Sequence, residues 1–444
     1  MEIVRQPGRL SFHRRPRLCA AICAAYVSFG TDVAEAKTTA YRFGKIVDGT
    51  GKTHTNALLV IEDDRIKGVG VPETQISSAA VSIVDMRPYT AIPGLVDVHT
   101  HMTYVYDERS NQKPIEQLLK RHPAATMFLS QRNALRTLEA GVTTVRDLGS
   151  IDGIDIAMRD LIKQGDMVGP RMLVSGLPLF ATDEPVKQGQ SPSPGAADGV
   201  VEVQRVARQQ LAAGADHIKL VGSTGGYDDV TGFQTFSYEE MKAAVDVAHR
   251  AGKRCAIHSY GTSGARDAVR AGADSIEHAT DIDDATLAEM ARRRIFYVPT
   301  IDHNRYYAES SQVYGFPPSS LSNLRTFIPK NFETARRAFR MGVPLAMGSD
   351  AVFTMFGQNT HELRWFVKLG MTPAQALATA TTNAATLLGM EKSIGTLAPG
   401  YFADVVAVEG DPLADINVVI EKVRWVMKGG GVVVDRTIAS HIVP

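Results

Sequence analysis

The chain has 444 residues, of which 44% are hydrophobic and 22% are charged. This composition excludes a disordered chain, and the length suits one large core and a smaller unit. Basic and acidic residues both number 48, so no net charge attracts the protein to nucleic acid or to an anionic membrane. We therefore expect its partner to be a small molecule.

Residues 1–36 have the pattern of a signal peptide. Three arginines precede an apolar run, residues 18–29, which is too short to span a bilayer, and residues 34–36 form a small-x-small cleavage site. The pattern predicts export to the periplasm or the medium, with no membrane attachment after cleavage. A misassigned start codon or an apolar N-terminal anchor is the alternative. Cleavage leaves Cys255 as the one cysteine, which excludes an intrachain disulfide.

Both ends of the remaining chain are rich in short β-type runs separated by turn residues. These runs are residues 41–47, 57–62, 66–71 and 81–85 near the start, and 400–408 and 423–434 near the end. Neither end has enough apolar strands to close a core alone. We expect residues 37–91 and 393–444 to form one small β-sandwich domain together.

In residues 92–392, apolar strand-like runs alternate with stretches of helical period. The expected strands are residues 95–98, 143–146, 172–175, 217–221, 256–258, 275–277, 296–299 and 345–347. The clearest helical stretches are residues 131–140, 201–213, 238–251 and 284–294. Eight strands alternating with helices predict an α/β fold, a (β/α)8 TIM barrel.

Polar side chains follow several of these strands. His99 and His101 end the first strand and point to the same side of it, because side chains two apart in a strand share a face. Four more metal-competent side chains lie in or after later strands: Lys219, His258, His278 and Asp350. Each alone would most often be a satisfied core residue or a turn. Together, at the strand ends where barrels carry their active sites, they predict a metal centre.

Lys219 is unusual in such a set, because a buried ammonium next to metal cations would be repelled and costly to desolvate. Reaction of its neutral amine with carbon dioxide would give an anionic carbamate able to bridge two metals. The alternative is that Lys219 points outward into solvent.

This set resembles that of the binuclear metal-dependent amidohydrolase superfamily. The resemblance extends to residues 138–147, 372–377, 383–389 and 395–404. Within the superfamily, the chain is most similar to the imidazolonepropionase-related and Xaa-Pro dipeptidase-like branch, which includes ochratoxin-hydrolysing amidohydrolases. The resemblance implies a hydrolase of amide or peptide bonds and a homo-oligomer, octamers being known among such relatives.

The resemblance also implies two Zn²⁺ ions. His99, His101 and Asp350 would hold one ion, His258 and His278 the other, and carboxylated Lys219 would bridge both. A metal-bridging hydroxide would attack the amide carbonyl, and Asp350 would pass its proton to the leaving nitrogen. Imidazolonepropionases and deaminases of the superfamily work with one metal and without this lysine. The presence of Lys219 therefore favours the binuclear hydrolases.

Substrate residues are predicted from the loops after the strands. In similar enzymes the loop 222–227 lies beside the metals, where Tyr227 would donate to the oxyanion or to a substrate carboxylate. Gly222 in the same loop and His361 after the eighth strand are further substrate-binding candidates. The alternatives are a flexible glycine turn with an aromatic anchor, and a helix-capping or surface role for His361.

The expected substrate is an N-acyl amino acid or a dipeptide with a free C-terminal carboxylate, cleaved as by a carboxypeptidase or dipeptidase. Dipeptidase relatives often carry Gly-Gly-His after the third strand, where this chain has the apolar segment 177–181. We therefore expect room for a bulky aromatic acyl group, as in an ochratoxin-like amide of phenylalanine.

Two other functions remain open. One is hydrolysis of a lactone, a cyclic amide or a phosphotriester at the same dizinc site. The other is a non-catalytic binding protein, which would be expected to have lost a ligand, whereas none is missing here.

Overall fold

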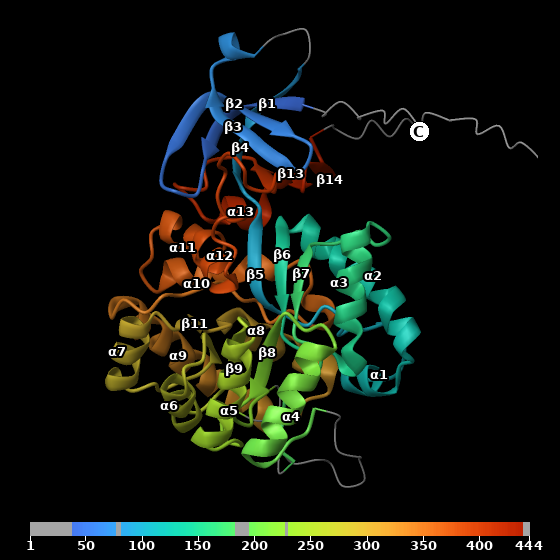
Figure 1. Ribbon diagram of the computed structural model, residues 1–444, viewed down its shortest axis with the longest axis vertical. Helices are drawn as coiled ribbons and strands as arrows, with labels where there is room; N and C mark the ends of the chain where they lie inside the picture. The colour runs from blue at the N-terminus through green and yellow to red at the C-terminus, as the bar shows by residue number, and fades with distance from the viewer. Residues whose placement is uncertain (1–37, 77–80, 183–194, 227–229, 438–444) are drawn as a thin grey trace, which may run out of the picture. The chain divides into compact units, whose positions relative to one another are not determined.

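The computed structural model describes residues 38–76, 81–182, 195–226 and 230–437. The expected signal peptide lies outside these residues. Strands from both ends of the chain form a seven-stranded sheet in the order β14-β13-β12-β4-β1-β2-β3. Its strands are β1 (Thr38–Val47), β2 (Thr53–Glu62), β3 (Arg65–Val71), β4 (Ser82–Pro93), β12 (Val405–Val408), β13 (Val423–Lys428) and β14 (Gly431–Asp435). The first and the last strands of the chain lie together in this domain, blue and red in Figure 1. The two ends meet where β4 pairs with β12 in antiparallel register.

Alternation along β12 shows how this sheet is packed. Val405 and Ala407 lie in the sheet's own apolar core, whereas Val406 and Val408 lie in the large core of the rest of the chain. Successive side chains of a strand point to opposite faces, so one face closes the small domain and the other packs toward the barrel. The small β domain that both ends build is thus confirmed.

The expected barrel strands are present as two parallel sheets. The first contains β5 (Leu95–Thr100), β6 (Val142–Asp147) and β7 (Arg171–Val174), and the second β8 (His217–Val221), β9 (Arg254–Ser259), β10 (Ser275–His278) and β11 (Phe296–Val298). Between β7 and β8, the Leu179 N–H donates to the Lys219 carbonyl at 2.9 Å. This bond joins the first sheet to the second. Together with the short segment at the eighth position of the barrel, it completes a (β/α)8 architecture.

The eighth position of the barrel is a short segment instead of a regular strand. The Tyr297 N–H donates to the Pro344 carbonyl, and the Val98 N–H donates to the Met347 carbonyl, both at 2.9 Å, so the segment joins β11 to β5. Gly348 ends it where a Cβ would lie 2.5 Å from Val298 and 2.7 Å from His99. Only glycine allows this close approach, which brings the following residues to the end of β5.

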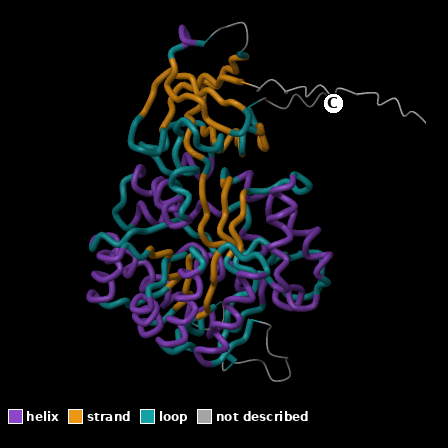
Figure 2. Tube along the Cα trace, in the orientation of Figure 1, coloured by secondary structure: helices purple, strands orange, loops and turns teal. Residues whose placement is uncertain are grey.

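Helices surround the barrel strands (Figure 2). They are α1 (Pro114–Lys120), α2 (Pro123–Glu139), α3 (Ile154–Gln164), α4 (Gly199–Ala212), α5 (Tyr238–Arg250), α6 (Thr262–Ala271), α7 (Asp284–Arg293), α8 (Ile301–Tyr314), α9 (Pro318–Arg340), α10 (Glu362–Lys368), α11 (Pro373–Thr379), α12 (Thr382–Leu388) and α13 (Asn417–Glu421). Short 3₁₀ turns lie at Glu73–Gln75, Ile151–Gly153, Phe353–Met355 and Asn359–His361. Among the described helices, none has the length and apolar character needed to cross a membrane.

The four helical stretches expected from the sequence correspond to α2, α4, α5 and α7. A capping box explains the start of α5, because the Ser237 hydroxyl accepts from the Glu240 N–H while the Glu240 carboxylate accepts from the Ser237 N–H. Helix α8 is not among the helical stretches that the sequence marks most clearly. It buries the polar residues Asp302, His303 and Asn304, so its sequence lacks an apolar stripe of helical period.

Candidate metal centre

All six expected metal-binding side chains lie at the carboxyl ends of barrel strands or in the segment after them. His99 and His101 lie at the end of β5, Lys219 in β8, His258 in β9 and His278 in β10, with Asp350 after the eighth position. The His278 ring lies 4.9 Å from the His99 ring and 4.5 Å from the His258 ring, measured between centroids. The strand ends therefore bring the histidines into one buried cluster.

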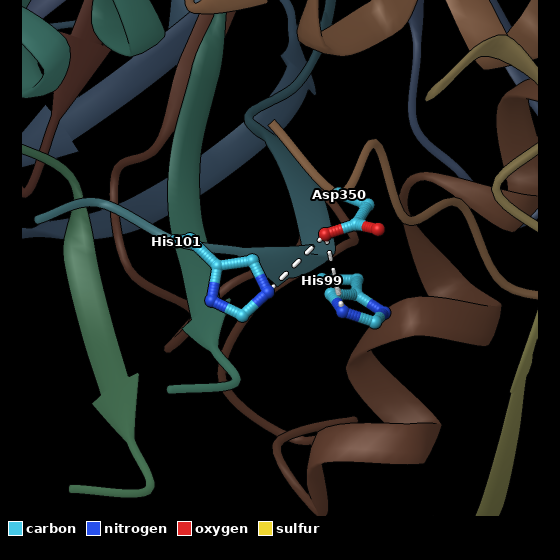
Figure 3. Close-up of side chains that lie close together, drawn as sticks. All are labelled: His99, His101 and Asp350. Atoms are coloured by element: carbon cyan, nitrogen blue, oxygen red, sulfur yellow. Dashed lines mark ion pairs between the residues drawn. The ribbon is translucent and has the colours of Figure 1, made fainter. Parts of the chain in front are cut away.

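The tightest part of this cluster contains His99, His101 and Asp350 (Figure 3). Asp350 Oδ1 lies 3.5 Å from His99 Nε2 and 3.2 Å from His101 Nε2. One potential ligand atom of each residue lies within 4.8 Å of the others. Two imidazole nitrogens and a carboxylate oxygen that converge in this way form a donor set that suits zinc.

Hydrogen bonds fix the orientation of both β5 histidines. His99 Nδ1 lies 2.8 Å from Glu277 Oε2, and His101 Nδ1 lies 2.9 Å from the Gly149 carbonyl oxygen. Because a carboxylate and a carbonyl can only accept, each Nδ1 carries the proton. His99 Nε2, which has no hydrogen-bond partner among the described residues, is therefore left with a free lone pair, as in metal-binding histidines whose second nitrogen is held by an outer partner.

Two imidazole nitrogens in this cluster are buried without a hydrogen-bond partner. They are His99 Nε2 and His258 Nε2, and neither bonds to any residue in the described part of the chain. Burial lowers the pKa of His258 to about 3, so its ring is neutral. Leaving such a nitrogen unpaired costs about 1–3 kcal/mol, which a bound cation would recover. The residues present therefore fit a metal ion.

Glu277 connects His99 to the interior of the barrel. Its other oxygen accepts from Arg146 Nη2 at 2.9 Å, and both side chains of this pair are almost completely buried. Breaking a buried ion pair by removing one partner costs about 3–5 kcal/mol. The pair therefore holds the Glu277 carboxylate, and through it the His99 ring, in one position.

Asp97 positions the segment that carries Asp350. This buried carboxylate accepts from the Ser349 N–H at 2.9 Å and from the Asn359 amide at 3.0 Å. Asp350 itself has a φ of 52° and His278 a φ of 73°, in the left-handed region that residues other than glycine rarely adopt. Such strain persists only where surrounding contacts impose it, and it is typical of functional sites.

Lys219 is only 3% exposed. Burial lowers its pKa to about 8, although the carboxylates of Glu277 and Asp350 act in the opposite direction. At pH 7 roughly a tenth of the amine is then neutral, far more than for an ordinary lysine. The alternative, that Lys219 points outward into solvent, is thereby excluded.

Sequence reasoning missed His303, which lies in the first turn of α8. Its Nε2 lies 3.3 Å from Asp350 Oδ2, and its Nδ1 has no hydrogen-bond partner in the described part of the chain. Burial raises the pKa of Asp350, but the charges of His303, His99 and His101 outweigh it and hold that pKa well below its usual range. His303 follows the seventh strand, a strand end where no candidate had been placed.

The three substrate-binding candidates are Tyr227, Gly222 and His361. Tyr227 lies outside the described residues. The Gly222 N–H donates to the His258 carbonyl at 2.9 Å, and its carbonyl accepts from the Thr235 N–H at 3.1 Å, so its backbone ties β8 to β9. His361 Nδ1 lies 3.8 Å from Asp302 Oδ2, which is the α8 residue next to His303. Substrate contacts by Tyr227, Gly222 and His361 stay predictions.

Part of the apolar segment 177–181 is buried in the protein. Leu179 is completely buried and belongs to the large core, and Ala181 is 6% exposed. Pro178 packs against Gly149, whose carbonyl holds His101. The segment therefore packs against residues that hold His101, and room for a bulky aromatic acyl group stays a prediction.

The profile of the amidohydrolase family matches residues 90–433. An ochratoxinase from Aspergillus niger is 32% identical over 96% of this chain and 90% of its own length. An imidazolonepropionase from Fusobacterium nucleatum is 23% identical over 83% of this chain and 89% of its own. The crystal structure of a Xaa-Pro dipeptidase with bound methionine in the active site superposes with a TM-score of 0.81 and 31% identity, covering 89% of this chain and 99% of that one.

Proposed function

The chain belongs to the amidohydrolase family and is a hydrolase of amide or peptide bonds, and from this premise we propose that it is a dizinc enzyme that cleaves N-acyl amino acids or dipeptides with a free C-terminal carboxylate. The observation that carries the proposal is the pair of buried, unpartnered Nε2 atoms of His99 and His258, on either side of His278. Two such nitrogens, in a cluster where burial lowers the pKa of His99, His258 and His278, call for cations.

Six side chains would hold the two metals. His99, His101 and Asp350 would hold one ion, and His258 and His278 the other. Lys219, as its carbamate, would bridge both. Carboxylation turns the one side chain that would repel cations into an anionic ligand, and the lowered pKa of the Lys219 amine favours that reaction. When bound, the two ions supply Lewis acidity that makes water a nucleophile near neutral pH and polarises the amide carbonyl.

Asp350 is the proposed general base and acid. Its low pKa keeps it ionised and able to accept the proton of the attacking water. The amide nitrogen must then be protonated before it departs, and Asp350 would deliver that proton. His303, 3.3 Å from Asp350 Oδ2, would orient the carboxylate and share the proton during the transfer.

The substrate class rests on the relatives. The Xaa-Pro dipeptidase structure has methionine bound in its active site, and ochratoxinase is the relative named above that is 32% identical over most of both chains. The names ochratoxinase and Xaa-Pro dipeptidase are both consistent with an amide substrate that releases an amino acid with a free carboxylate. An ochratoxin-like aromatic amide is one such substrate. Recognition of that carboxylate would discriminate substrates that the metal centre alone cannot distinguish.

The test is a panel assay on the purified, zinc-loaded protein. Its members are N-acyl amino acids, dipeptides, amides without a carboxylate, lactones, cyclic amides and phosphotriesters. We expect kcat/KM to be highest for the N-acyl amino acids and dipeptides. A higher value for lactones, cyclic amides or phosphotriesters would replace the proposal with those activities at the same dizinc site.

Two further expectations stay predictions. Export follows from the sequence pattern of residues 1–36, and homo-oligomer formation, including an octamer, follows from the family resemblance. Size-exclusion chromatography with light scattering and N-terminal sequencing of the secreted protein would test them directly.

A further inference from the structure

An apolar pocket of about 300 Å³ lies where α1, α8 and the turn after α8 meet. Four aromatic side chains line it: Tyr307, Tyr314, Phe316 and Phe353. Ile115 from α1 lines it as well. We call it the aromatic pocket. Neither Gly222 nor His361, the two described residues that sequence reasoning had assigned to the substrate, lines it.

Two walls of the aromatic pocket pack against rings that contact the candidate metal ligands. The Tyr307 ring meets the His303 ring edge-on, with centroids 4.2 Å apart. On another side, Phe353 lies 6.2 Å from the ring of Tyr104, which stacks on His101 at 4.6 Å. A substrate whose amide lies at the metal ligands would therefore have this pocket as its neighbour.

The walls of the pocket are held in place by contacts with one another and with neighbouring side chains. Tyr314 lies 5.4 Å from Phe316 and 5.6 Å from Phe353 between ring centroids, within the range of favourable aromatic pairs. The Tyr314 hydroxyl bonds to the Tyr306 hydroxyl, which also bonds to Thr354 Oγ1 at 2.7 Å. The polar end of Tyr314 is thereby satisfied within the protein, and its ring presents an apolar surface.

The rim of the pocket does not select for charge. Lys113 and Glu116 both lie there, one of each sign. Gly315 has a φ of 64°, and a Cβ at this position would lie 2.5 Å from Lys113 Nζ, so the lysine packs closely over the turn. Selection must therefore come from the apolar interior.

We propose that the aromatic pocket binds an aromatic ring of the amide substrate and makes the enzyme prefer ring-bearing amides. The inference rests on the proposed amide hydrolysis and adds the position and residues of a ring-binding subsite. A volume of about 300 Å³ is at the lower end of ligand pockets and suits one or two fused rings. The ring belongs either to the acyl group or to the leaving amino acid, and the two arms of the test distinguish these.

The decisive variant narrows the pocket from α1. Ile115→Trp adds an indole where the substrate ring would lie, and Leu119→Trp is the matched control, because Leu119 is on the same helix but 55% exposed and does not line the pocket. Thermal unfolding of both variants checks the fold. If Ile115→Trp is unfolded, Phe316→Ala, which removes one wall, takes its place.

The first measurement is calorimetric binding of 2-naphthylmethanol, which contains no amide. We expect Ile115→Trp to weaken its binding at least about tenfold, whereas Leu119→Trp leaves it within about twofold of the wild type. Equal binding by the wild type and Ile115→Trp would overturn the proposal. This result does not depend on hydrolysis, so failure of the pocket and failure of the proposed function are separable.

The second measurement compares kcat/KM for matched substrates. One arm pairs N-naphthoylglycine with N-acetylglycine, and the other pairs N-acetylnaphthylalanine with N-acetylalanine. We expect the ratio within one pair to fall at least about tenfold in Ile115→Trp, which identifies the half of the substrate that carries the ring. An unchanged ratio in both pairs, with hydrolysis intact, would overturn the ring-binding role.

Discussion

The metal centre and the aromatic pocket lie side by side but are built from different parts of the fold. The centre consists of polar side chains on and after barrel strands, of which His99 is held by Glu277 and His101 by the Gly149 carbonyl. The aromatic pocket consists of rings from helices and turns, which are held by ring contacts and by the hydrogen bond between the Tyr314 and Tyr306 hydroxyls. The strands thus fix the chemistry, while the helices around them are free to change which substrate is accepted.

Helix α8 connects the two regions, because it carries His303 toward Asp350 and Tyr307 into the aromatic pocket. Changes at the strand ends should therefore abolish turnover of every substrate. Changes on α8 should alter rate and selectivity together.

Metal removal should have the largest effect. Elemental analysis of protein produced with ample zinc should give close to two metals per chain, and a chelator should abolish turnover, by at least about 10⁴-fold. Binding of 2-naphthylmethanol to the aromatic pocket should survive chelation, because no metal ligand lines that pocket. One metal per chain with full activity would refute the binuclear arrangement.

Lys219→Ala should lose the metals and activity together, with kcat/KM lower by at least about 10³-fold. The bridging carbamate would be missing, so short carboxylic acids with added zinc should restore a small part of both. Lys163→Ala, at an exposed position of α3, is the control and should be unaffected. Full activity of Lys219→Ala would show that this lysine does not hold the metals.

His303→Ala should lower kcat about 10–100-fold with little change in metal content, because it removes the His303 Nε2 that lies 3.3 Å from Asp350 Oδ2. His303→Gln keeps an N–H that can donate to Asp350 and should retain more activity. His249→Gln, on an exposed histidine, is the matched control. Equal kcat for wild type and His303→Ala would leave His303 with only a packing role.

Methyl-esterifying the carboxylate of an otherwise good substrate should lower kcat/KM by about tenfold. The ester leaves the scissile amide intact but removes one charge-assisted contact. Steady-state kinetics on the acid and the ester measure the effect. Equal cleavage of both would identify a general amidase in which the aromatic pocket provides most of the selectivity.

The smallest effect is on stability and concerns Glu362, which joins the two regions by holding the start of α8. Its carboxyl oxygens accept from the Ile301 N–H at 2.9 Å and from the Asp302 N–H at 2.8 Å. Burial raises the pKa of Glu362 to about 8. Between about pH 5 and 8 the folded state therefore binds more protons than the unfolded state, so the free energy of unfolding should fall as pH rises, by on the order of a few kcal/mol.

Glu362→Gln should remove that part of the pH dependence. Denaturant unfolding at pH 5 and at pH 8 measures it, with Glu108→Gln at an exposed position as the control. The difference between the two pH values should be smaller in Glu362→Gln than in the wild type. The same slope in both proteins would show that Glu362 does not titrate in this range.

The sequence by itself determined the barrel and predicted the six candidate metal-binding side chains on its strands and in the segments after them. Strands such as β8 are apolar runs of local origin, and the alternation of side chains fixes which residues share a face. The carboxyl ends of parallel barrel strands lie at the same end of the barrel. The sequence alone therefore suffices to assign His99, Lys219 and Asp350 to one candidate site. The small domain followed in the same way from β-type runs at both ends of the chain.

Only the tertiary structure decided the residues that act across the fold. Glu277 is 178 positions from His99 in the sequence, and the two residue types alone do not predict that they form a hydrogen bond. His303 and the rings of the aromatic pocket lie on or beside α8, which buries polar groups and so lacks an apolar stripe of helical period. Their positions depend on how helices pack against the closed barrel, and local sequence does not encode that packing.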